Sequence, residues 1–149
     1  MKRYAWAVVG LGLWAMGAGG ARAQGRAAEQ QGTASKPAAE LRQNYPNPFN
    51  PATTIPFTLG GNLFANGHRP TVSLKIYNVL AQLVAIPILQ GTGQPLDAQQ
   101  MDCTNPAGCS YTAYWDGNVR GGQQASSGVY IYQLVVDGQR FTKKMLIMK

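Results

Sequence analysis

The two cysteines are the residues whose type and spacing point most directly to chemistry. Cys103 and Cys109 have five residues between them and are the only thiols in the chain. An isolated pair in an exported protein is normally oxidised, and closing so short a loop stabilises a fold by roughly 2 kcal/mol. Zinc is the alternative, but it needs four ligands, and the sole histidine, His68, precedes Cys103 by 35 residues. We therefore predict a structural disulfide.

The sequence Asp116-Gly117-Asn118 is similar to the first half of a calcium-binding loop. A helix–loop–helix calcium site needs further oxygen ligands and a closing glutamate. The residues that follow, VRGG, supply neither. A plain turn is the other interpretation, and we favour it, with Trp115 packed in the core beside it.

Catalytic patterns are missing from the rest of the chain. There is no G-x-S-x-G motif, no glycine-rich phosphate loop and no obvious pair among the six carboxylates. His68 lies in the sequence NGHRP, which has the composition of a loop, where a lone histidine is usually solvated. We expect a protein without enzymatic activity, bound metal or cofactor.

An aromatic and basic surface is a further candidate for function. Tyr77, Tyr130, Tyr132 and Lys75 could form an exposed face on which bases, sugars or partner chains stack. Half-buried cross-strand packing of the same tyrosines is the alternative, which we favour. The formal net charge is +7, but no run of more than two basic residues occurs, so we expect no nucleic-acid partner.

The elements that would position these residues alternate with a period of two. Apolar residues recur at every second position in 71–77 and 111–115, and 128–136 is apolar on both faces, as in a central strand. Prolines in 53–59 and 83–89 place those strands at sheet edges or bulges. With a final strand at 141–148 and no helical period after the N-terminal segment, the pattern predicts an all-β, immunoglobulin-like antiparallel β-sandwich of roughly seven strands.

The N-terminal part has a different composition. Residues 1–23 carry a positive start, an apolar stretch and the sequence Ala21-Arg22-Ala23, which are the marks of a cleaved signal peptide. A membrane anchor is the alternative, but the apolar stretch falls short of the roughly 20 residues that span a bilayer. Residues 24–40 have no aromatic or large aliphatic side chain and predict a flexible tether, leaving the domain at 41–149.

Near its start the domain has the sequence QNYPNPFNPATTIPFTL at residues 43–59. We call residues 43–52 the lead-in, and a strand is expected directly after it at residues 53–59. The prolines of the lead-in fix φ and exclude helix, so this segment should be extended, stiff and hooked. Tyr45 and Phe49 are large enough to fasten it to the interior. We expect both to be core anchors, together with Trp115 and Tyr130.

These segments resemble a known family. LRQNYPNPFNPATTIPFTL is similar to the opening of the type A C-terminal sorting domain of bacterial type IX secretion, and VSLKIYNVLAQLV, WDGNVRGGQQASSGVYIYQL and KKMLIMK resemble its later segments. The resemblance covers residues 41–149. Ala81 departs from it, because glycine is usual there; if the turn needs a positive φ, alanine costs about 1 kcal/mol.

The resemblance implies a recognition role. It predicts an exported domain that is bound by the outer-membrane type IX translocon and a sortase-like peptidase, on its way through the periplasm to the cell surface or medium. Lys143, Lys144 and Met145 lie in the final strand, whose edge could present its backbone groups to a partner by strand addition. Paired lysines that only keep such an edge from aggregating are the alternative, and the resemblance favours translocon recognition. The alternative is a small secreted structural or adhesive module, similar to the immunoglobulin-like domain of flagellar hook-capping proteins.

Overall fold

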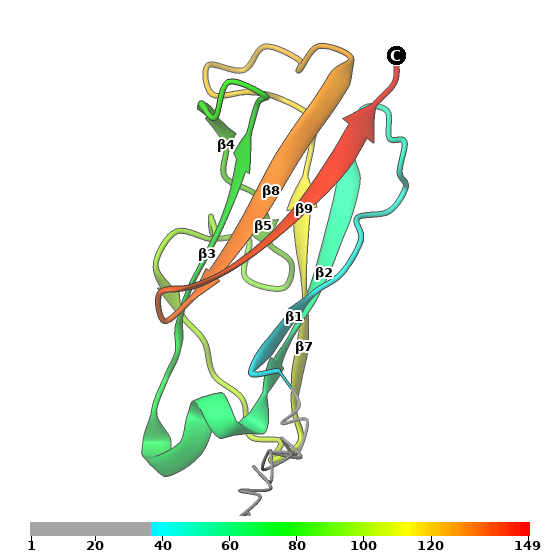
Figure 1. Cartoon of the computed structure of the whole chain (residues 1–149). Coiled ribbons are helices and arrows are strands. Elements are labelled where there is room, and N and C mark those ends of the chain that lie inside the picture. The colour runs from blue at the N-terminus through cyan, green and yellow to red at the C-terminus, as the bar shows by residue number, and fades with distance from the viewer. Residues whose placement is uncertain (1–36) are drawn as a thin grey trace, which may run out of the picture. The chain divides into compact units, whose positions relative to one another are not determined.

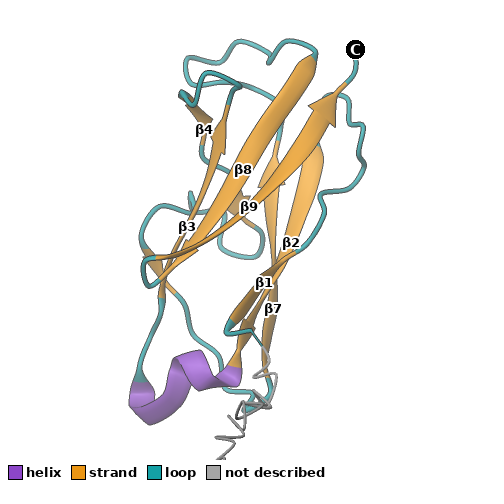
Figure 2. Cartoon of the chain, viewed as in Figure 1, coloured by secondary structure: helices purple, strands orange, loops and turns teal. Residues whose placement is uncertain are grey.

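The computed structural model describes residues 37–149, so the expected signal peptide and residues 24–36 of the expected tether lie outside the described residues. Nine strands and one 3₁₀ helix make up this part of the chain (Figure 2). Their bounds are β1 (Ala39–Leu41), β2 (Thr53–Gly60), the 3₁₀ helix η1 (Gly61–Gly67), β3 (Thr71–Tyr77), β4 (Leu83–Ala85), β5 (Ile88–Leu89), β6 (Gln99–Gln100), β7 (Gly108–Trp115), β8 (Gly128–Val136) and β9 (Gln139–Ile147). The first strand begins two residues before the expected domain boundary at 41.

Two antiparallel sheets form the domain (Figure 1). One has the order β1-β2-β7-β5, and the other has the order β4-β3-β8-β9 with the short β6 beside β3. This is the strand order of an immunoglobulin-like sandwich, in which strands A, B, E and D face strands C, F and G. The expected all-β sandwich is therefore confirmed, with nine strands rather than roughly seven.

The core lies between the two sheets and follows the period-two pattern. Its buried side chains come from alternate positions of the long strands, as in β2, where buried and half-buried residues alternate. The largest fully buried side chains are Tyr132, Phe49, Phe57, Ile55, Leu59, Leu74, Ile76, Leu96, Leu134 and Met145. Such burial is the main favourable contribution to stability in a domain of this size. The described residues include no helix long and apolar enough to cross a membrane.

The segment expected as one strand at 83–89 is divided between the sheets. β4 pairs with β3 in one sheet, whereas β5 pairs with β7 in the other. Pro87 lies between the two strands, where the chain crosses from one sheet to the other, because it has no N–H to donate to a ladder. Its carbonyl accepts a bond from the N–H of Leu96 at 2.9 Å. Both β4 and β5 are edge strands, as the proline predicts.

The expectation for Pro56 is wrong, because β2 is an inner strand. β2 lies between β1 and β7 without a register shift on the β7 side. The missing N–H of Pro56 is directed toward β1, where Arg42 donates its own N–H to the Pro56 carbonyl at 3.0 Å. β1 ends at Leu41, so the proline removes a bond only at the margin of the sheet.

Two turns set the register of the second sheet. Asp137 and Gly138 have positive φ values of 47° and 84° and join β8 to β9 as a two-residue hairpin, as predicted. Between β3 and β4, Ala81 has a φ of 58°. The carboxamide oxygen of Asn78 accepts bonds from the N–H groups of Leu80 and Gln82, each at 3.0 Å, and holds this turn.

The long excursion between β5 and β7 is packed onto the sandwich. Leu96 and Met101 are buried, and the expected disulfide is present, with the Cα atoms of Cys103 and Cys109 5.9 Å apart. The hydroxyl of Tyr111 donates to the carbonyl of Asp102 at 2.7 Å, which fastens the disulfide loop to β7.

Candidate recognition edge

The lead-in lies along the final strand, β9. The N–H of Phe49 donates to the carbonyl of Leu146 at 3.0 Å, and the N–H of Met148 donates to the carbonyl of Phe49 at 3.2 Å. Phe49 and Ile147 thereby form a parallel bridge. In Figure 1 the cyan loop after β1 runs beside the red end of β9. Segments almost 100 residues apart in sequence therefore make one surface.

Side chains of the lead-in complete this attachment. The amide of Gln43 donates to the carbonyl of Lys144 at 2.9 Å, and the carboxamide oxygen of Asn47 accepts the N–H of Leu146 at 3.1 Å. All these bonds lie on the side of β9 that faces away from β8. We call residues 43–49 together with residues 144–148 the composite edge.

A buried polar network holds the lead-in in place. Asn44 is 2% exposed and donates to the Thr53 hydroxyl at 3.0 Å and to the Pro46 carbonyl at 3.2 Å. The hydroxyl of Tyr132 accepts the N–H of Asn44 at 3.0 Å and donates to the carbonyl of Arg42 at 2.8 Å. Every buried side-chain polar atom in the described chain has a partner, so the network is complete.

Burial raises the pKa of Tyr132 above its ordinary value, and the bond from the Asn44 N–H only partly offsets that rise. The side chain is fully buried, so desolvation is the dominant cause of the raised pKa. Tyr132 thus remains a neutral donor and acceptor at physiological pH.

The structure buries three of the four expected core anchors. Phe49, Trp115 and Tyr130 are buried, and Trp115 makes edge-on contacts to the other two rings at centroid distances of 5.4 and 5.7 Å. Tyr45 is not an anchor, since it is 58% exposed. Its backbone pairs with Thr54, which directs Tyr45 outward and leaves the inward position to its neighbour Asn44.

The three residues assigned to translocon recognition do not share a surface. Met145 is 2% exposed and packs in the core, so its side chain is not available to a partner. Lys144 is exposed on the outer face of the sheet, and Lys143 is half-buried on the inner side of β9. The period of two separates the neighbouring side chains, and of the three residues only Lys144 directs its backbone groups to the composite edge.

The tyrosines pack against the sandwich, and two of them are more deeply buried than the half-buried packing that we expected. Tyr130 and Tyr132 point into the core, whereas Tyr77 lies half-buried on the opposite face of the sheet. Lys75 forms an ion pair with Asp97, with 3.3 Å between Nζ and Oδ1. These four residues therefore do not form a continuous aromatic and basic face.

His68 serves as a link between loops. Its Nε2 lies 2.8 Å from Oδ2 of Asp137, and Oδ1 of Asp137 accepts the N–H of Thr71 at 2.9 Å. Burial alone would raise the pKa of Asp137, but the hydrogen bonds from His68 and Thr71, with the His68 charge, lower it overall. Among residues 37–149, no three His, Cys, Asp or Glu side chains are grouped to hold a metal ion.

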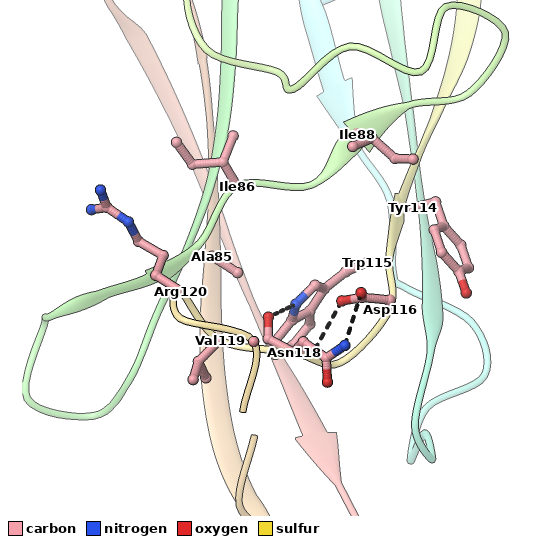
Figure 3. A pocket seen from close by; sticks show the side chains of 10 residues that line it. Ala85, Ile86, Ile88, Tyr114, Trp115, Asp116, Asn118, Val119 and Arg120 are labelled. Carbon is pink, nitrogen blue, oxygen red and sulfur yellow. Dashed lines mark hydrogen bonds between the residues drawn. The ribbon is translucent and has the colours of Figure 1, made fainter. Parts of the chain in front are cut away.

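An open hollow of about 370 Å³ lies beside Trp115 (Figure 3). Its polar groups are mostly engaged with one another: Asp116 accepts the N–H and the carboxamide of Asn118, and the indole N–H of Trp115 donates to the Asn118 carbonyl. Asp116 to Asn118 therefore form the expected turn. Arg120 and Tyr114 lie at the margin, with no nucleophile or proton-transfer pair between them.

Comparison with solved structures shows a fold shared with part of PorU. Dimeric latent PorU from Porphyromonas gingivalis is 21% identical, with a TM-score of 0.51 over 74% of this chain and 9% of that chain. PorZ, an essential surface component of the type IX secretion system of the same bacterium, is 16% identical, with a TM-score of 0.40 over 72% of this chain and 11% of that chain. The chain therefore corresponds to a small part of either protein. No family model matches it, and no curated protein matches its sequence.

Sequence reasoning missed the residues that build the composite edge. Gln43, Asn44 and Asn47 are ordinary polar residues, and their partners lie far along the chain, as in the separation of 101 residues between Gln43 and Lys144. The available signal was their position among three prolines within six residues, since a stiff segment needs side-chain partners for its backbone.

Proposed function

We propose that this domain is a non-catalytic sorting module, recognised as a folded unit by the outer-membrane type IX secretion machinery. The observation that carries the proposal is the composite edge. Two of the segments that resemble the family, residues 43–49 and the end of β9, bond to each other along one strand. An address built in this way depends on the fold, because neither segment forms the surface alone.

The fold supports the same proposal. The domain is a small sandwich with the termini of its described part on strands β1 and β9, and a similar fold is found within PorU. A compact immunoglobulin-like unit can be added to unrelated proteins without disturbing them. The proposed route is export from the cytoplasm, binding to the translocon, and removal by a sortase-like peptidase at the surface.

A reporter fusion tests the proposal. The fusion consists of a signal peptide, a monomeric reporter and residues 37–149, and it is produced in a type IX host and in an isogenic strain without the translocon. We expect reporter in the medium or on the surface of the first strain and in the periplasm of the second. Equal distribution in the two strains would remove the sorting function.

A structural or adhesive role is the second candidate, and one observation favours it. The lead-in covers backbone groups of β9 that would otherwise form an open edge, which is a device that stable monomeric sandwiches use against aggregation. On this account the domain should stabilise or attach its protein wherever it is exported, without dependence on the translocon. The strain comparison separates the two candidates.

A further inference from the structure

The outer edge of β9 is covered over only part of its length. Backbone groups alternate between the two sides of a strand. Every second residue of β9 counted back from Leu146, namely Lys144, Thr142 and Arg140, therefore directs its N–H and carbonyl away from β8. The lead-in bonds to the backbone of Leu146 and to the carbonyl of Lys144. Further back, Thr142 directs its N–H and carbonyl to the same side, and within residues 37–149 neither has a backbone partner. We call Arg140 to Lys144 the open edge.

A groove of about 280 Å³ lies beside the open edge, between β9 and β1. Ala39 and Leu41 of β1 and Phe141 of β9 supply its apolar walls, and the first two are buried. β1 pairs only with β2, so the groove separates the margins of the two sheets. Apolar side chains from a strand placed beside β9 would enter this groove.

The open edge is positively charged. Arg140, Lys143 and Lys144 form no ion pair with any carboxylate in the described chain. Glu40, which also lines the groove, pairs with Arg42 at 3.5 Å. Cations on an edge discourage pairing with a second copy of the same chain, and for the same reason they favour an acidic partner.

We propose that the open edge accepts an extended segment of a partner protein as an additional strand, with alternating apolar and acidic side chains. Main-chain bonds to Thr142 and to the N–H of Lys144 supply affinity, and the alternation supplies specificity. Side chains on one face of the added strand fill the groove at Leu41 and Phe141, and those on the other face lie beside Arg140 and Lys144. The inference rests on the proposed sorting function, since it takes the partner segment to belong to the translocon.

The test uses the full chain and purified type IX translocon in detergent. Thr142→Pro removes an N–H that points away from β8, so the β8–β9 ladder keeps all its bonds while the edge is blocked. We expect this variant to bind the translocon at least about tenfold more weakly, as the loss of the central main-chain bond requires. Thr142→Ala is the matched control, and it should bind as the wild type does.

Hydrogen exchange supplies a readout that needs no variant. The amides of Thr142 and Lys144 should exchange rapidly in the free chain and slowly in the complex, whereas the amide of Leu146, already bonded to Asn47, should change little. Protection of Thr142 in the free chain would overturn the inference, because another part of the chain would already occupy the edge.

The outcomes separate this inference from the function on which it rests. If the wild type binds, and Thr142→Pro binds equally with no new protection at Thr142, the open edge is not the docking site, although the sorting function stands. If the wild type does not bind the translocon, both are wrong. Should Thr142→Pro fail to fold, the exchange measurement on the wild type decides.

Discussion

The hydroxyl of Tyr132 donates a hydrogen bond to the carbonyl of Arg42, 2.8 Å away. Arg42 already donates its N–H to the carbonyl of Pro56, and in an antiparallel pair the reciprocal N–H would come from residue 56. Proline has no N–H, so a tyrosine from the opposite sheet satisfies the carbonyl instead. The two sheets are thereby joined at the point where the lead-in leaves β1.

Replacement of Tyr132 by phenylalanine should destabilise the domain by about 1–3 kcal/mol, because the Arg42 carbonyl and the Asn44 N–H both lose a buried partner. The measurement is the free energy of unfolding in urea. Tyr77→Phe is the control, since Tyr77 is half-buried on the outer face, and it should change stability by less than about 0.5 kcal/mol. Equal effects of the two substitutions would contradict the proposed role of Tyr132.

Ala81→Gly should stabilise the domain by about 1 kcal/mol. Ala81 has a φ of 58°, which glycine adopts without the steric cost that a Cβ atom imposes. Thermal or urea unfolding measures the difference. At Ala65, where φ is −60°, the same substitution should give no gain. A loss of stability in Ala81→Gly would show that the turn is not strained.

The double substitution of Cys103 and Cys109 by serine should cost at most about 2 kcal/mol, because the closed loop is short. Non-reducing peptide mapping should find the two residues joined within one molecule. The double variant should still fold, since the bond from Tyr111 to Asp102 remains. Two free thiols in the purified protein, or a variant that no longer folds, would contradict this account.

Asp137 should make the domain sensitive to acid. Its pKa in the folded state is below the ordinary value of 3.8, so the folded state binds fewer protons than the unfolded state around that pH. The stabilisation is therefore complete above the ordinary pKa and is lost as the pH falls through the folded-state pKa.

Asp137→Asn removes this titration while asparagine still tolerates the positive φ of 47°. The variant should lose less stability than the wild type when the pH is lowered from about 5 to about 2.5. Urea unfolding across this range is the measurement. His68→Ala should reduce the pH dependence in the same direction, and parallel curves for wild type and both variants would exclude the role of this pair.

The sequence predicts the core more reliably than the edges. Val72, Leu74 and Ile76 alternate with polar residues, and the structure buries all three, because a strand with one covered face imposes a period of two. The Asp137-Gly138 hairpin is equally local. Both features depend on residues within one or two strands, so no distant contact can change them.

The errors occur where a distant partner decides. Tyr45 is larger and more apolar than Asn44, yet the backbone pairing with Thr54 directs the asparagine inward, where Thr53 and Tyr132 satisfy it. Pro56 was expected at an edge, but the sequence does not show that its strand would face the end of a short β1. The composite edge was missed for the same reason, since it joins both ends of the domain.

The central claim is that the export address lies in β9 as part of the folded sandwich. Its most direct test compares the exported fraction of three reporter fusions in a type IX host: residues 37–149, the same domain without residues 141–149, and the full domain with Trp115→Ala. Trp115 is 3% exposed, and its loss should cost about 3–5 kcal/mol and unfold much of the domain. We predict that the intact fusion reaches the surface or medium and that both altered fusions stay in the periplasm. Export of the truncated fusion at the level of the intact one would contradict the account.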